Sequence, residues 1–111
     1  MSSQSNGYRV STETFTDLEA TVSAFDVEQT HTIFQALADD RRILIMRLLG
    51  ETELCVCDLV ELFDIEYSKL SYHLKKLKDA GLVTADRDGN FVTYRPTSCG
   101  EDVIDVIQQF Q

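Results

Sequence analysis

The spacing of apolar side chains along the chain predicts a mostly helical fold. In several segments apolar residues recur every third or fourth position, as they do on one face of an amphipathic helix. Helices are predicted over about residues 14–25, 27–38, 41–49, 53–63, 67–80 and 101–110. Residues 1–13 lack the pattern and are rich in Ser and Thr, so we expect a flexible N-terminal segment followed by one domain over residues 14–111.

Two of the predicted helices have the arrangement of a helix-turn-helix. The short helix at 53–63 and the longer one at 67–80 flank a three-residue turn, and the longer helix has a buried seam of leucines. Beyond it, apolar and β-branched strands at 82–85 and 91–95 flank a polar, glycine-containing turn. A hairpin in this place is a wing. The predicted fold class is therefore mainly α with a small β-hairpin, a winged helix-turn-helix.

The second helix of this unit has an outward face suited to the major groove of DNA. Hydroxyl, amine and aromatic groups there can reach phosphates and base edges, and the hairpin tip adds two more polar groups. The candidate DNA-binding residues are Ser68, Lys69, Ser71, Tyr72, His73, Lys75, Lys76, Arg87 and Asn90. The alternative for the helix alone is an ordinary solvated surface, and an exposed tyrosine within a basic stripe favours DNA.

Charge is distributed unevenly along the chain. The net charge is −9, which taken as an average argues against DNA binding. Residues 65–95, however, hold six basic and four acidic residues and form the only positive stretch. A basic patch on an acidic body can be steered to DNA, weakly at high salt. The acidity is equally consistent with a high-salt cytosol.

Other functional classes find little support in the sequence. No apolar run approaches the roughly eighteen residues of a membrane span, and the N-terminus does not resemble a signal peptide, so we expect a cytoplasmic protein with no membrane partner. A thiol enzyme would need a Cys-x-x-Cys pair or a histidine placed as a base, and neither is evident. We expect no enzymatic activity and no required cofactor.

The three cysteines, Cys55, Cys57 and Cys99, are the candidate metal ligands. In a reducing cytosol a disulfide framework is not expected. On an intact helix, residues two apart lie about 200° apart, so Cys55 would face the core and Cys57 the solvent. From that spacing alone, Cys55 could simply fill the core and Cys57 could be an incidental surface thiol. A position at a helix start, however, favours the thiolate that soft ions require, and shared binding would distort the first turn.

Several motifs resemble the ArsR/SmtB family of metal-responsive repressors, in its arsenic-sensing branch. The segment Glu-Leu-Cys-Val-Cys-Asp-Leu at 53–59 is similar to the family's metal-binding box. Further similar segments lie at 36–44, 71–77, 80–83 and 86–95. The resemblance covers about residues 30–96. It implies a homodimer joined by terminal helices that binds double-stranded operator DNA and leaves it when As(III) or Sb(III) binds the thiolates.

The sequence departs from the family pattern in one respect. The family box often has a third cysteine where this chain has Val60, and As(III) prefers three thiolates. Cys99 is the only other thiol, and whether it reaches the pair is open. The family's alternative site on the last helix is not evident, because Glu101, Asp102 and Asp105 are accompanied by no histidine there.

Four other hypotheses remain beside the arsenic-responsive repressor. The same fold could respond to a soft divalent metal such as Cd(II), or to oxidants through Cys57, although a Cys-x-Cys disulfide is expected to be strained. It could also be a winged-helix regulator without a metal response, or one that binds a protein partner in place of DNA, which the acidic total would suit.

Overall fold

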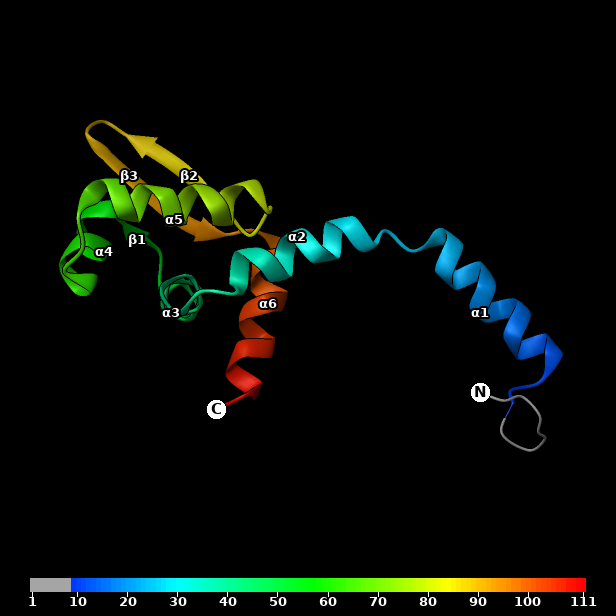
Figure 1. Cartoon of the computed structure of the whole chain (residues 1–111). Helices are drawn as coiled ribbons and strands as arrows, with labels where there is room; N and C mark the ends of the chain where they lie inside the picture. The colour runs from blue at the N-terminus through cyan, green and yellow to red at the C-terminus, as the bar shows by residue number, and fades with distance from the viewer. Residues whose placement is uncertain (1–8) are drawn as a thin grey trace.

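The computed structural model describes residues 9–111, and its elements follow the predicted order (Figure 1). They are α1 (Thr12–Ala24), α2 (Val27–Leu37), α3 (Asp40–Leu49), β1 (Leu54–Cys55), α4 (Val56–Phe63), α5 (Tyr67–Asp79), β2 (Val83–Asp88), β3 (Phe91–Pro96) and α6 (Ser98–Gln109). Of the segment expected to be flexible, residues 1–8 lie outside the described residues, and Thr12 and Glu13 already belong to α1.

Short polar side chains fix where most of the helices begin. Asp26 accepts a hydrogen bond from the backbone N–H of Gln29 at the start of α2, and Asp39 accepts from Arg41 and Arg42 at the start of α3. Such caps satisfy N–H groups that the helix itself leaves free. The turn between α4 and α5 contains Asp64, whose left-handed backbone (φ 48°) ends α4 and reverses the chain.

The sheet is larger than the predicted hairpin. Its antiparallel strands lie in the order β1-β3-β2, with Cys55 opposite Thr93 in the β1–β3 pair. The expected strand at 82–85 continues to Asp88, and the turn narrows to Gly89 and Asn90. Gly89 has a φ of +63°, the conformation that a two-residue hairpin turn needs.

The core lies where the helix-turn-helix, α3 and the sheet meet. Its most buried side chains are Ile45, Met46, Leu59, Leu70, Leu74, Leu77 and Leu82. The leucine seam predicted for α5 is therefore confirmed. Helix α6 packs on α3 from the other side through Ile104, and it begins three residues earlier than predicted because Thr97 caps it.

Helix α1 extends away from the rest of the molecule (Figure 1). None of its residues is buried, and its apolar stripe is open to solvent, with Leu18 49% and Val22 78% exposed. The radius of gyration is 19.7 Å, against about 13 Å for a compact chain of this size. Among residues 9–111, no helix combines the length and the hydrophobicity needed to cross a bilayer.

Candidate functional site

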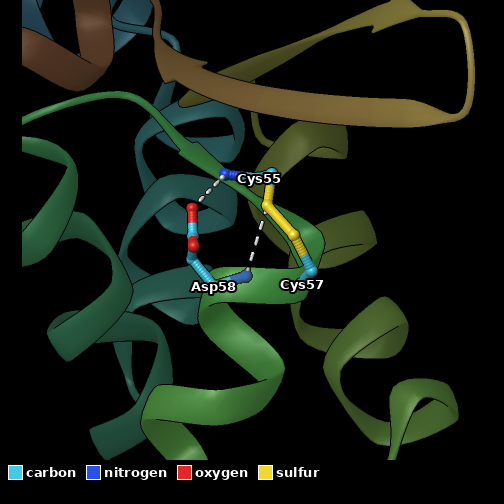
Figure 2. Close-up of side chains that lie close together, drawn as sticks. All are labelled: Cys55, Cys57 and Asp58. Atoms are coloured by element: carbon cyan, nitrogen blue, oxygen red, sulfur yellow. Dashed lines mark hydrogen bonds between the residues drawn. A yellow bond between two sulfur atoms is a disulfide. The ribbon is translucent and has the colours of Figure 1, made fainter.

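Cys55 and Cys57 lie together at the N-terminus of α4, the first helix of the helix-turn-helix (Figure 2). The predicted helix over 53–63 is wrong in its first turn. Cys55 ends the short strand β1 and is the N-cap of α4, with extended backbone (φ −83°, ψ 161°). Because only Cys57 is inside the helix, the two side chains converge instead of pointing 200° apart, and they need no distortion of the first turn to meet.

The two sulfurs are joined by a disulfide in this structure, with the Cα atoms 5.3 Å apart. The expectation that the two cysteines lie on opposite sides of one helix is therefore wrong. It assumed an intact helix through both residues, whereas the extended conformation of Cys55 turns its side chain over the helix start. In the reduced form, the same convergence presents two thiols to one atom.

Asp58 completes a reciprocal capping arrangement with Cys55 (Figure 2). The backbone N–H of Asp58 donates to the Sγ of Cys55 at 3.3 Å, and the backbone N–H of Cys55 donates to the Asp58 carboxylate at 3.2 Å. The Cys55 sulfur and the Asp58 carboxylate thereby satisfy two backbone N–H groups at the start of α4. Sequence reasoning missed this role of Asp58, although the three-residue spacing of a capping box was its signal.

The structure brings two of the three predicted metal ligands together. Within residues 9–111, the potential ligand atoms of Cys55, Cys57 and Asp58 lie within 4.8 Å of one another, and Cys99 is outside that group. Cys99 is an exposed free thiol in the first turn of α6, beyond the end of β3. Once the disulfide is reduced, the donor set within the described residues of one chain is two sulfurs and one carboxylate, which suits a thiophilic ion.

An open hollow of about 520 Å³ connects the cysteine pair to the wing. It is lined on one side by Cys55, Cys57 and the apolar face of α4, and on the other by the hairpin tip, including Arg87 and Asn90. The two predicted wing contacts to DNA therefore line the same hollow as the two cysteines.

Most of the candidate DNA-binding side chains on α5 are at the surface. Ser68, Lys69, Tyr72, Lys75 and Lys76 are exposed and Ser71 is half-buried. The ammonium of Lys76 lies 5.5 Å from the centre of the Tyr72 ring. Lys75 donates to Asp79 at 2.8 Å, and this hydrogen bond raises the pKa of Lys75 and lowers that of Asp79.

His73 differs from the other α5 candidates because its ring faces inward and is only 9% exposed. The Arg42 guanidinium lies 3.0 Å from its Nδ1. Since a guanidinium only donates, Nδ1 accepts and the ring is neutral with its proton on Nε2. Its expected place among the groups facing DNA is thus corrected: the seam of α5 turns the ring towards α3.

The environment of His73 favours this neutral form. Burial lowers its pKa, and the charges of Arg42 and Arg41 lower it further, against the opposing effect of Asp39. The Asp39 carboxylate lies 3.8 Å from Nδ1, too far for a hydrogen bond. Asp39 is held ionised: burial would raise its pKa, but the backbone N–H groups of Arg42 and Arg41 bring it below the ordinary value.

Comparison with known proteins identifies the family. Residues 39–85 match the model of the bacterial regulatory protein arsR family. An arsenical resistance operon repressor from Staphylococcus xylosus is 38% identical over 82 residues, covering 74% of this chain and 76% of that protein. The chain belongs to the arsR family. The resemblance to this family is thereby confirmed.

Other relatives of this arsR-family protein carry names of two kinds. An arsenical resistance operon repressor from Bacillus subtilis is 50% identical over 62 residues, 55% of this chain and 59% of that protein. The cadmium resistance transcriptional regulatory protein CadC from Listeria innocua is 38% identical over 71 residues, 63% of this chain and 60% of that protein. The chain thus matches about three fifths of the length of these relatives.

A solved structure confirms the fold class. The homodimeric winged helix-turn-helix DNA-binding domain Mb0332 from Mycobacterium bovis superposes with a TM-score of 0.70 at 27% identity, covering 85% of this chain and 84% of that one. The predicted fold class, mainly α with a winged helix-turn-helix, is therefore confirmed.

Proposed function

We propose that this arsR-family protein is a homodimeric, DNA-binding transcriptional repressor, released from its operator when As(III) or Sb(III) binds Cys55 and Cys57. The observation that carries the proposal is the position of the two thiols. They cap and begin the first helix of the helix-turn-helix, and they line the same hollow as Arg87 and Asn90 of the wing. A ligand held there touches the DNA-reading unit directly.

The energy required for such a switch is small. A hundredfold loss of DNA affinity corresponds to about 2.7 kcal/mol of coupling between the two sites. Two metalloid–thiolate bonds exceed that amount, and the Cys55 sulfur that they engage also caps α4. Binding therefore competes with the hydrogen bond that fixes the start of this helix, and the displacement is passed to α5 and the wing.

DNA recognition is assigned to the exposed face of α5, with Ser68, Lys69, Ser71, Tyr72, Lys75 and Lys76, and to Arg87 and Asn90 at the wing tip. No enzymatic role is proposed. Cys99 is proposed as a ligand only if it comes from the other subunit of the dimer, because it is outside the ligand group of its own chain.

The test begins with DNA selected from a random duplex pool by the reduced, full-length protein. Release of the selected duplex is then followed by fluorescence anisotropy with As(III), Sb(III), Cd(II), Zn(II) and peroxide, each in parallel. We expect As(III) and Sb(III) to release DNA at the lowest concentrations. The repressor function would be contradicted if the protein selected no sequence and lost its affinity for every duplex at moderate salt.

Two observations favour a second inducer class. The Asp58 carboxylate beside the sulfurs supplies an oxygen donor that suits Cd(II) better than As(III), and the disulfide between Cys55 and Cys57 is the product that an oxidant would form. If Cd(II) alone or peroxide alone releases DNA in the same experiment, that agent is the inducer and As(III) is not.

A further inference from the structure

The hollow beside the cysteine pair is much larger than a single metalloid ion needs. It measures about 520 Å³, whereas a dry protein cavity of about 150 Å³ accommodates benzene. Apart from the two sulfurs, the walls nearest α4 and β3 are largely apolar and include Val56, Val60, Phe91 and Val92. An ion chelated by the thiols would leave this volume to water.

The number of thiols sets a second constraint. Inorganic As(III) has three exchangeable hydroxyl groups, but the described part of one chain gathers only two sulfurs, and its third potential donor is a carboxylate. A trivalent arsenical with one carbon substituent has two exchangeable groups, which two thiols satisfy completely. Its substituent must then lie beside the sulfurs, where the apolar hollow begins.

We propose that the preferred ligand of Cys55 and Cys57 is a trivalent arsenical carrying one apolar organic substituent, with the substituent seated in the hollow. The inference rests on the proposed function and names its ligand class. It also links the ligand to the wing, because the hollow that would hold the substituent is lined by Arg87 and Asn90.

The binding step is an exchange of bonds without oxidation or reduction. A phosphine reductant and water first open the disulfide, giving two thiols and the phosphine oxide. The arsenical R–As(OH)₂ then forms two As–S bonds and loses its two As–O bonds. Each departing hydroxide takes the proton of one thiol, so two waters leave and the As–C bond remains intact.

The experiment compares ligands that make the same two As–S bonds but differ in substituent. Reduced full-length protein is loaded with phenylarsine oxide or with methylarsonous acid, and a soluble dithiol is titrated until half of the arsenical is removed, as read by intact mass. The dithiol forms equivalent As–S bonds but has no hollow. The dithiol concentration at the midpoint therefore reports the binding that the protein provides beyond the two As–S bonds. Arsenite is the third arm.

We expect the phenyl compound to need at least tenfold more dithiol than the methyl compound. Val92→Phe fills the hollow from β3 and should remove most of this difference, while alkylation followed by intact mass counts the free thiols and shows that they are intact. Phe91→Ala removes one wall and is the second variant, because Phe91 is 62% exposed and its loss leaves the core untouched. It should lower phenyl retention several-fold.

A third thiol in the hollow should reverse the preference. Val60 follows Cys57 by one helical turn and lines the hollow, so Val60→Cys should strengthen arsenite retention and weaken the advantage of the phenyl compound. Equal midpoints for phenyl and methyl in the wild type, or a phenyl advantage that survives Val92→Phe, would overturn the inference but leave arsenic sensing intact. If none of the three arsenicals binds the protein or makes it release DNA, the proposed function is overturned as well.

Discussion

At the scale of single residues, the chemistry depends on the unusual position of Cys55. It caps a helix with its sulfur, so the group that binds a soft ion also holds the first turn of α4. Serine is a strong N-cap, which means that Cys55→Ser preserves the cap while removing the thiol. This makes the substitution a clean test of sensing.

We expect Cys55→Ser and Cys57→Ser each to abolish release of DNA by As(III), with DNA affinity in the absence of arsenic within about twofold of wild type. The reason is that one remaining thiolate cannot chelate. The measurement is anisotropy of the selected duplex with increasing arsenite. Cys99→Ser is the matched control, and a small effect is expected because Cys99 is outside the ligand group of its own chain.

The Cys99 control also has an informative opposite result. A strong loss of response in Cys99→Ser, with normal DNA binding, would place that thiol in a site shared between subunits. Normal release in both the Cys55 and Cys57 variants would reject the sensing proposal whatever Cys99 does.

His73 gives the folded protein a predictable dependence on pH. Its pKa is lowered below 6.5 in the folded state, chiefly by burial, so the unfolded chain binds its proton first as the pH falls. The stabilisation is therefore present above about pH 6.5 and is lost as the pH falls towards the folded pKa. We expect the midpoint of urea unfolding to decrease between pH 7 and pH 5.

The control for this prediction is His73→Gln, which keeps an acceptor for Arg42 but does not titrate. It should flatten the decrease over that range. The carboxyl of Asp39, whose pKa is lowered from 3.8, contributes in the same direction only at more acidic pH. An equally steep decrease in the variant would assign the pH dependence to other groups.

At the scale of secondary structure, local signals predicted the helices and failed where pairing is non-local. Asp26 and Asp39 begin helices through their side-chain caps, and Gly81 follows α5 with a positive φ, and all three are local signals. Strand β1 has two residues and exists only because Leu54 and Cys55 pair with Tyr94 and Thr93 of β3, far along the chain. Without that pairing, the apolar spacing of 53–63 reads as one helix, and the convergence of the cysteines is hidden.

Helix α5 is the element proposed to read DNA. We expect Lys69→Ala and Tyr72→Ala to weaken binding of the selected duplex while the urea midpoint stays unchanged, because both side chains are exposed. Loss of a phosphate contact by Lys69 should reduce the salt slope of log affinity by about one. Lys78→Ala, on the same helix but outside the proposed contact set, is the control. Unchanged affinity and slope in the first two variants would remove this face from the interface.

The junction between β2 and α6 allows a test of the fold itself. A Cβ at Gly100 would lie 2.0 Å from the backbone carbonyl oxygen of Leu82, which no side-chain rearrangement relieves. Gly100→Ala should therefore destabilise the protein by about 1–3 kcal/mol, as overpacking does, measured by urea unfolding. Gly89→Ala is a useful comparison because nothing lies within 4 Å of that Cβ and only its φ of +63° opposes the change.

At the scale of the whole molecule, charge and shape point to an assembly. Most of the acidic residues lie outside the helix-turn-helix and wing, so the positive stretch at 65–95 is the part that can approach DNA. The apolar stripe of α1 is separated from the core of its own chain, and Phe110 at the end of α6 is 78% exposed. Such surfaces are expected to be covered by another subunit.

We therefore expect a homodimer in which α1 and α6 of each subunit cover one another's apolar stripes. Sedimentation equilibrium at micromolar concentration should give twice the chain mass, and Leu18→Asp should shift the protein towards monomer, because it places a charge in the stripe. Ala20→Asp, which adds the same charge on the opposite side of α1, should remain dimeric.

Dimerisation and DNA affinity should then be lost together. A two-fold dimer presents two α5 helices to half-sites separated by about one helical turn of DNA or a multiple of it, so the selected sequence should be palindromic. The Leu18→Asp monomer can occupy only one half-site and should lose most of its affinity for that duplex. A wild-type monomer, or a Leu18→Asp variant that binds the full site as tightly as wild type, would show that α1 has another role.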